Sequence, residues 1–223
     1  MNEVSSSNLT GADLGADLVR RDLAAVWHPC TQMKDHESLP LLPVRRAEGV
    51  WLELHDGRRV LDGMSSWWGN LFGHCHPTLV KAAQDQAATL EHVIMAGFTH
   101  EPIVDLSESL VRLAPPGLTR CFYADNGSAA IEVALKMSFH YWRNTGRSRK
   151  TRFITLSNGY HGETLGALSV GDVDLFKDTY RPLLLEVITV PSPDAFHREP
   201  GSTPAEHARK MFAHMEATLA RHA

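Results

Sequence analysis

The spacing of apolar residues divides the chain into short extended runs and amphipathic helical segments. Apolar residues three and four positions apart are typical of a helix with one buried face, and short β-branched runs are typical of strands. This pattern predicts helices over residues 18–26, 77–92, 102–113, 129–142 and 205–221. It predicts strands over residues 44–47, 50–55, 59–61, 119–124, 152–156 and 186–190.

The order of these elements predicts an α/β fold. Strands that alternate with helices from residue 119 onward favour a largely parallel sheet, whereas the Asp56-Gly57 pair favours a hairpin before it. We expect a mobile tail over residues 1–16, a segment with short strands over 17–76, and the first part of a large domain over 77–223. The chain ends near a helix with no closing element, which suggests the front part of a longer protein.

Composition narrows the classes of function. The chain has 223 residues, 43% of them hydrophobic and 22% charged, and a net charge of −4, so nothing indicates nucleic-acid binding. No apolar run is long enough for a membrane span, and the polar start is not a secretory signal. Three cysteines form no disulfide framework, which favours the cytoplasm. His74-Cys75-His76 does not have zinc-site spacing, so we expect no metal.

Asp125-Asn126-Gly127-Ser128 is the most informative segment, because it lies between a predicted strand and a predicted helix. Gly127 allows close approach to the backbone, Ser128 offers a hydroxyl, and the first helical amides face an anion with the helix dipole behind them. The turn therefore predicts a phosphate site. Taken alone, Ser128 is more typical of an ordinary helix cap.

A second strand-to-helix junction follows at residues 158–163 and carries Tyr160. Ligand sites in such sheets lie beyond the carboxyl ends of the strands, where both junctions fall. A phosphate turn with an aromatic ring nearby suits a phosphorylated aromatic cofactor. Tyr160 alone is equally compatible with packing, and His161 and Glu163 with the start of a helix.

Five segments in order carry a family resemblance. They are Trp27-His28-Pro29, Asp56-Gly57-Arg58-Arg59, residues 62–68, residues 125–128 with Glu132 and Lys136, and residues 158–164. Together they resemble the class III aminotransferases of pyridoxal-phosphate fold type I over about residues 25–191. Within that family, the His-Pro start and Ser65-Ser66-Trp67-Trp68 resemble the adenosylmethionine–8-amino-7-oxononanoate aminotransferases of biotin synthesis.

The resemblance implies a cofactor, substrates and roles for individual residues. Gly127 and Ser128 would bind the phosphate of pyridoxal 5'-phosphate, Tyr160 would stack on its ring and border the substrate, and Trp67 would line the substrate pocket. The enzyme would move an amine from S-adenosylmethionine to 8-amino-7-oxononanoate, giving 7,8-diaminononanoate. Family members build their sites at a dimer interface, so the resemblance also implies a homodimer.

The chain departs from the family pattern in two ways. Cys30 occupies a substrate-binding position where the family has tyrosine, and a thiol lacks the reach of a phenol. The family's cofactor-binding lysine lies beyond Ala223, and none of the six lysines here has its sequence context, so we assign no catalytic residue. Two alternatives stay open: another class III aminotransferase acting on an ω-amino acid or amino-ketone, and a non-catalytic phosphate-binding fragment.

Overall fold

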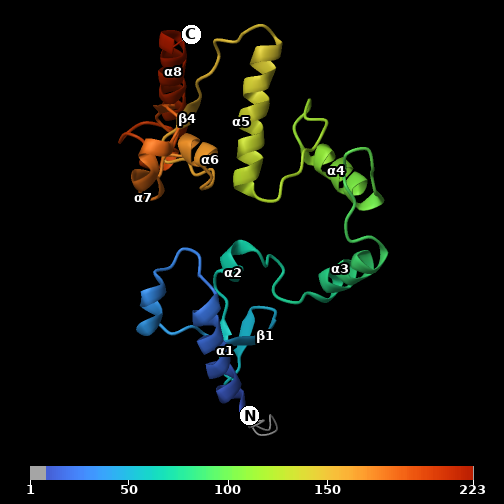
Figure 1. Cartoon of the computed structure of the whole chain (residues 1–223). Helices are drawn as coiled ribbons and strands as arrows, with labels where there is room; N and C mark the ends of the chain where they lie inside the picture. The colour runs from blue at the N-terminus through green and yellow to red at the C-terminus, as the bar shows by residue number, and fades with distance from the viewer. Residues whose placement is uncertain (1–8, 223) are drawn as a thin grey trace. The chain divides into compact units, whose positions relative to one another are not determined.

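The computed structural model describes residues 9–222. The chain forms two compact units, one over Met1–His100 and the other over Glu101–Ala223 (Figure 1). The predicted division at residue 77 stays a prediction, and the helix that begins there belongs to the first unit.

The first unit contains a three-stranded antiparallel sheet in the order β1-β2-β3. Gly49 and Gly57 lie in the turns between its strands with φ of 55° and 86°, a conformation that glycine adopts without strain. Leu54, with 1% of its surface exposed, anchors the sheet in a small core. The strands fall where the apolar pattern predicted them: β1 spans Val44–Glu48, β2 spans Trp51–Leu54 and β3 spans Arg59–Leu61.

Helix α1 (Gly11–Ala25) corrects the expected mobile tail, because residues 11–16 belong to this helix. Its start is a capping box: the Asp13 amide donates to the Thr10 hydroxyl at 3.2 Å, and the Thr10 amide donates to the Asp13 carboxylate at 3.0 Å. This pairing satisfies two amides that the helix itself leaves without partners. The rest of the predicted tail, residues 1–8, lies outside the described residues.

Three further elements complete the first unit. Segment 62–70 contains α2, whose residues have positive φ and form a left-handed turn. Pro77 occupies the first turn of α3, a position that needs no amide proton. The elements are η1 (Met33–Glu37), α2 (Ser65–Trp68) and α3 (Pro77–Thr89).

The second unit contains helices and one pair of parallel strands. β4 (Ile154–Leu156) pairs with β5 (Ile188–Val190) in parallel, as expected for strands of a largely parallel sheet. The short elements over residues 174–183 were not predicted, because α7 has only four residues and Pro182 lies inside η2. The remaining elements are α4 (Glu101–Leu113), α5 (Gly127–Asn144), α6 (Leu165–Val170), α7 (Asp174–Lys177), η2 (Asp178–Leu183), η3 (Ala195–His197) and α8 (Pro204–His222).

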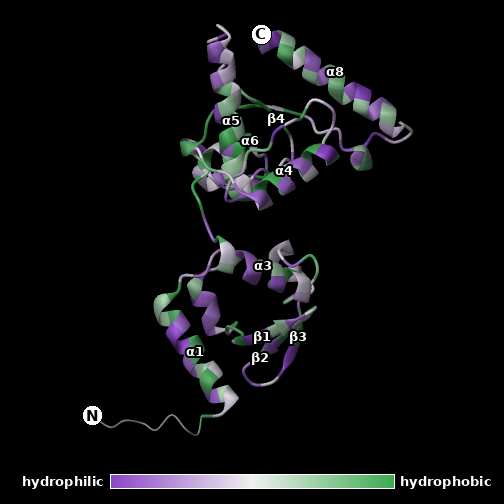
Figure 2. Ribbon diagram, turned by 90° about the vertical axis from the view of Figure 1, so that its right-hand side faces the viewer, coloured by the Kyte–Doolittle hydropathy of each residue, from purple (hydrophilic) through white to green (hydrophobic). Residues whose placement is uncertain are grey.

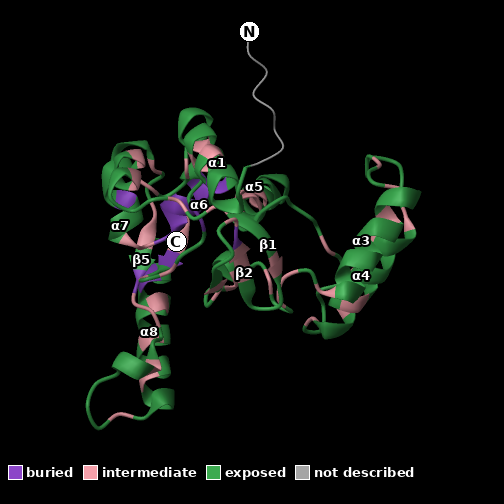
Figure 3. Ribbon diagram, turned by 90° about the horizontal axis from the view of Figure 1, so that it is seen from below, coloured by how far each residue is buried: buried purple, intermediate pink, exposed green. Residues whose placement is uncertain are grey.

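The core of the second unit lies around α6 and the parallel strands. Ala167, Leu168 and Val170 of α6 and Val190 of β5 are buried, and Figure 3 shows this cluster in purple. Helix α8 carries hydrophobic and hydrophilic residues along its length (Figure 2) and contacts β5. Thr155 and Val190 are the buried residues of the strand pair, whereas Leu156 is 37% exposed.

One predicted strand is wrong. Residues 119–124 have no strand assignment, and within the described range they form no ladder with β4 or β5. The run is apolar enough for a strand, but a strand also requires a neighbouring strand to receive its hydrogen bonds. The local sequence shows whether a run is apolar but not whether a neighbouring strand is present.

Candidate functional site

The predicted phosphate turn forms the start of α5, an 18-residue helix. The Asn126 side chain caps this helix by accepting a hydrogen bond from the Ala129 amide at 2.8 Å. The amides of Gly127 and Ser128 lie in the first turn of the helix, so they donate no hydrogen bond within it. A Cβ placed on Gly127 would meet nothing within 4 Å, so the backbone is open to a ligand. The arrangement can bind an anion.

Ser128 has the chemistry of a phosphate ligand in this structure. Its hydroxyl accepts a hydrogen bond from the Glu163 amide at 3.2 Å. A serine hydroxyl has one proton and two lone pairs, so its own proton is left for a phosphate oxygen. Gly162, with φ of 113°, permits this approach, because a Cβ at that position would overlap the Ser128 hydroxyl.

Tyr160 lies on the segment that contacts the phosphate turn. Its hydroxyl donates to Glu163 Oε1 at 3.1 Å, and its ring tilts against Phe176 with centroids 5.6 Å apart. The side chain is 57% exposed, which leaves ring surface for a ligand. Glu163 therefore links the tyrosine to Ser128. The suggestion that Glu163 begins a helix is wrong, because α6 starts at Leu165 after its N-cap Thr164.

Glu132 makes a second link between α5 and this segment, which sequence reasoning did not identify. Its Oε1 accepts hydrogen bonds from the Thr164 hydroxyl at 2.6 Å, the Gly166 amide at 2.8 Å and the Ala167 amide at 3.2 Å. These bonds, that from Thr164 above all, hold the pKa of Glu132 below its ordinary value. One carboxylate thus caps α6 from a neighbouring helix. The sequence signals for Glu132 are its spacing from Ser128, one turn along α5, and its place among the residues that resemble the family.

The other two predicted site residues belong to the first unit. Trp67 and Trp68 lie in the left-handed turn α2, 66% and 74% exposed, with ring centroids 6.2 Å apart in an edge-on arrangement. Cys30 is an exposed free thiol with φ of 52°. Thus Gly127, Ser128 and Tyr160 come together in the second unit, while Trp67 and Cys30 lie in the first.

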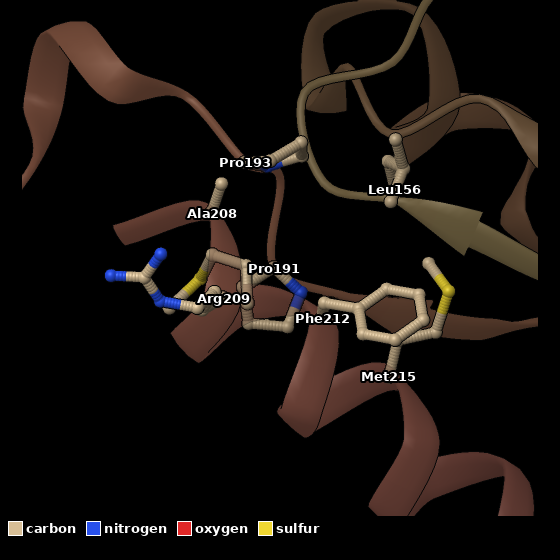
Figure 4. Close-up of a pocket in the computed structure, with 8 residues that line it drawn as sticks. Leu156, Pro191, Pro193, Ala208, Arg209, Phe212 and Met215 are labelled. Carbon is tan, nitrogen blue, oxygen red and sulfur yellow. The ribbon is translucent and has the colours of Figure 1, made fainter. Parts of the chain in front are cut away.

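An apolar pocket of about 480 Å³ is separate from the predicted site residues. It lies against α8 and the loop after β5, and Figure 4 shows Pro191, Pro193, Phe212 and Met215 around it. Its lining has no polar group suited to a phosphate beyond Arg209. Among residues 9–222, no cluster of three potential metal ligands occurs, and no helix is long and apolar enough to cross a membrane.

Comparison with known proteins identifies the family. The model of the class III aminotransferase family matches residues 32–222, and the chain belongs to that family. The predicted fold class, an α/β fold of pyridoxal-phosphate fold type I, is thereby confirmed. A solved ω-transaminase from Thermomicrobium roseum, 28% identical, superimposes with a TM-score of 0.81 over 92% of this chain and 46% of its own.

The curated relatives that match the chain share the name of one enzyme within this family. The chain is 49% identical over 183 residues to the adenosylmethionine-8-amino-7-oxononanoate aminotransferase of Helicobacter pylori, covering 81% of this chain and 41% of the relative. It is 41% identical to that of Geobacter sulfurreducens, covering 91% of this chain and 45% of the relative. The same enzyme from Methanocaldococcus jannaschii, with a solved structure, is 37% identical with a TM-score of 0.76, covering 80% of this chain and 41% of its own. The chain spans less than half the length of these relatives.

Proposed function

We propose that this chain supplies the phosphate turn and ring platform of an aminotransferase that moves the amine of S-adenosylmethionine to 8-amino-7-oxononanoate, giving 7,8-diaminononanoate. The observation that carries the aminotransferase assignment is the chain of contacts from Ser128 through Glu163 to Tyr160. The substrates follow from the names of the Helicobacter and Geobacter relatives and from the Trp67-Trp68 pair.

Pyridoxal 5'-phosphate fits the residues that are present. Two helix-start amides and the Ser128 proton would bind the phosphate, and the half-exposed Tyr160 ring would offer a flat surface for the pyridine. A solved ω-transaminase from Pseudomonas jessenii, 25% identical, was crystallised in complex with PMP. When bound, the cofactor acts as an electron sink and amine carrier. The protein contributes phosphate binding through Gly127 and Ser128, ring placement through Tyr160, and fixed geometry through Glu163.

Substrate recognition falls to the first unit in this proposal. The exposed Trp67 indole lines the ketone pocket, and Cys30 occupies a contact position where its small thiol leaves more space than a phenol. The complete enzyme is a homodimer. We place it in the cytoplasm, because all three cysteines are free thiols.

The rival function is that of an ω-transaminase. The superposition on the Thermomicrobium enzyme favours it, because its TM-score is as high as 0.81. Both activities need the phosphate turn and Tyr160, so these residues do not discriminate between them. The discriminating residues are Trp67 and Cys30, which face the substrate in the proposal.

The test uses the complete polypeptide, meaning this chain together with the portion that its relatives have beyond it. Diaminononanoate formation is measured with S-adenosylmethionine and then with lysine as donor. Trp67→Ala should lose catalytic efficiency for the ketone yet keep the cofactor, because Trp67 contacts only substrate. Cys30→Tyr should improve or preserve ketone use. No product with either donor, together with turnover of an ω-amino acid, would favour the rival.

A further inference from the structure

The turn that carries Trp67 has an unusual backbone. Ser65, Ser66, Trp67 and Trp68 have φ of 50°, 47°, 63° and 67°, so four consecutive residues adopt the left-handed conformation. Residues with a Cβ avoid this region because the side chain approaches the following carbonyl oxygen. Single left-handed residues are common enough in turns, but a run of four needs support from its surroundings.

The Trp68 amide donates to the Met64 carbonyl within the turn, and side-chain support comes from one carboxylate. Asp62 Oδ1 accepts a hydrogen bond from the Ser66 amide at 2.9 Å, and Oδ2 accepts one from the Ser66 hydroxyl at 2.7 Å. His74 Nε2 lies 2.8 Å from the same Oδ2. The bonds from Ser66 and His74 lower the pKa of Asp62 to about 2, so it is ionised at neutral pH. An ionised carboxylate only accepts hydrogen bonds, so His74 Nε2 carries a proton.

Asp62 and His74 are themselves fixed to the three-stranded sheet. The Asp62 amide donates to the Val50 carbonyl at 2.9 Å, and the His74 backbone exchanges hydrogen bonds with Gly49 at 2.7 and 3.1 Å. Their side chains are only 9% and 15% exposed. Both partners therefore hold the left-handed turn from a rigid base beside the turn between β1 and β2.

We propose that Asp62 is a positioning residue that holds the left-handed turn through Ser66 and so presents the Trp67 indole to the substrate. His74 orients the carboxylate from the opposite side. The role of Asp62 in catalysis rests on the proposed function, because it acts through Trp67 as the wall of the ketone pocket. Its role in the conformation of the turn does not.

The experiment compares Asp62→Asn with wild type in the complete polypeptide. Asparagine has the same shape as aspartate but no charge. One carboxylate oxygen becomes an NH₂ group, which is a donor and would face the donors of Ser66 or His74. We expect KM for 8-amino-7-oxononanoate to rise about tenfold, the equivalent of roughly one charge-assisted hydrogen bond, with little change in kcat or cofactor affinity. Asp56→Asn is the matched control, because the Asp56 carboxylate bonds to Arg58 in the turn between β2 and β3, away from the left-handed turn in sequence.

A second readout follows the turn directly. The edge-on indoles of Trp67 and Trp68 couple in circular dichroism, and Trp67→Phe identifies that signal. Asp62→Asn should diminish it, and adding Ser65→Gly should restore both the signal and KM in part, because glycine adopts positive φ without strain. An unchanged signal and KM in Asp62→Asn would overturn the proposal. The circular dichroism signal could be lost in Asp62→Asn and restored by Ser65→Gly in an enzyme that never uses the ketone. That result would support the role of Asp62 in holding the turn and would refute the proposed substrate.

Discussion

The Ser128 hydroxyl has two tasks that can be separated by substitution. It accepts the Glu163 amide within the protein, and its proton is directed to the cofactor phosphate in the proposed function. Alanine removes both bonds but adds no charge. Aspartate keeps an acceptor for Glu163 but places a negative charge against a phosphate, where like charges repel strongly.

We expect Ser128→Asp to weaken pyridoxal-phosphate binding far more than Ser128→Ala in the complete polypeptide. The alanine variant should lose about 1.5–3 kcal/mol of binding free energy, the value of a hydrogen bond to a charged group. Cofactor titration followed by absorbance measures both. Equal affinity in the two variants and in wild type would mean that the turn is only a helix cap.

At this scale the sequence predicted some residues and could not predict others. Ser128 and Tyr160 were singled out because short-range pattern predicts a strand-to-helix junction before each, although no strand forms over residues 119–124. Glu132, Gly162 and Glu163 were not assigned roles, because each acts on a residue more than thirty positions away. The need for glycine at 162 appears only when Ser128 is known to lie against it.

Among the elements, the contact between α5 and α6 decides how the cofactor platform is held. Helix α6 is short and buried from Gly166 to Val170, so its first amides require partners other than water. Glu132 of α5 provides them, and Gly166 leaves room for that carboxylate, which a Cβ would overlap. The phosphate turn and the Tyr160 segment therefore behave as one body.

Glu132→Gln should reduce the free energy of unfolding by about 1–3 kcal/mol, because it replaces a charged acceptor with a weaker one beside three donors. Thermal unfolding measures this loss. Glu108→Gln is the matched control, since Glu108 is an exposed partner of Arg112 at 4.0 Å and such pairs contribute little. If the two variants unfold alike, Glu132 does not cap α6.

The same carboxylate gives a pH dependence with a definite sign. Folding lowers the pKa of Glu132, so its stabilisation is present at neutral pH and is lost as pH falls below the ordinary range of a glutamate. As pH falls, the free energy of unfolding should decrease less in the Glu132→Gln variant than in wild type.

Elements differ in how well local pattern predicts them. The hairpin strands and the long helices carry their signals within a few residues, and they lie where expected. Segment 119–124 was predicted as a strand and is not one, because pairing depends on partners elsewhere in the chain. Helix α1 began earlier than predicted, because the cap formed by Thr10 and Asp13 outweighs the weak apolar pattern of residues 11–16.

For the whole molecule, we expect the 223-residue chain alone to show no transamination. Lys177 is buried and donates to the carbonyls of Ser169 and Gly171, so it is held by the end of α6. Lys81 pairs with Asp85, and Lys210 pairs with Glu199. Without a cofactor-binding lysine there is no covalent anchor and no base at the reacting carbon.

The measurement is incubation with pyridoxal phosphate, borohydride reduction and peptide mapping. Scattered, substoichiometric labelling is expected. A stoichiometric adduct on one of the six lysines, together with turnover, would show that the chain is catalytically sufficient. Phosphate binding without turnover even in the complete polypeptide would instead favour a non-catalytic binding protein.

The parallel pairing of β4 with β5 has a consequence for synthesis on the ribosome. Ile154 pairs with Ile188, so β4 emerges about 34 residues before its partner, a delay of roughly 2–7 s at usual translation rates. During that interval its apolar edge is open to association with other nascent chains. Thr155 of β4 donates a hydrogen bond to the Val170 carbonyl, so α6 is available to cover the strand well before β5 exists. We therefore expect substitutions that loosen α6 to lower the yield of folded protein in cells more than its stability once folded.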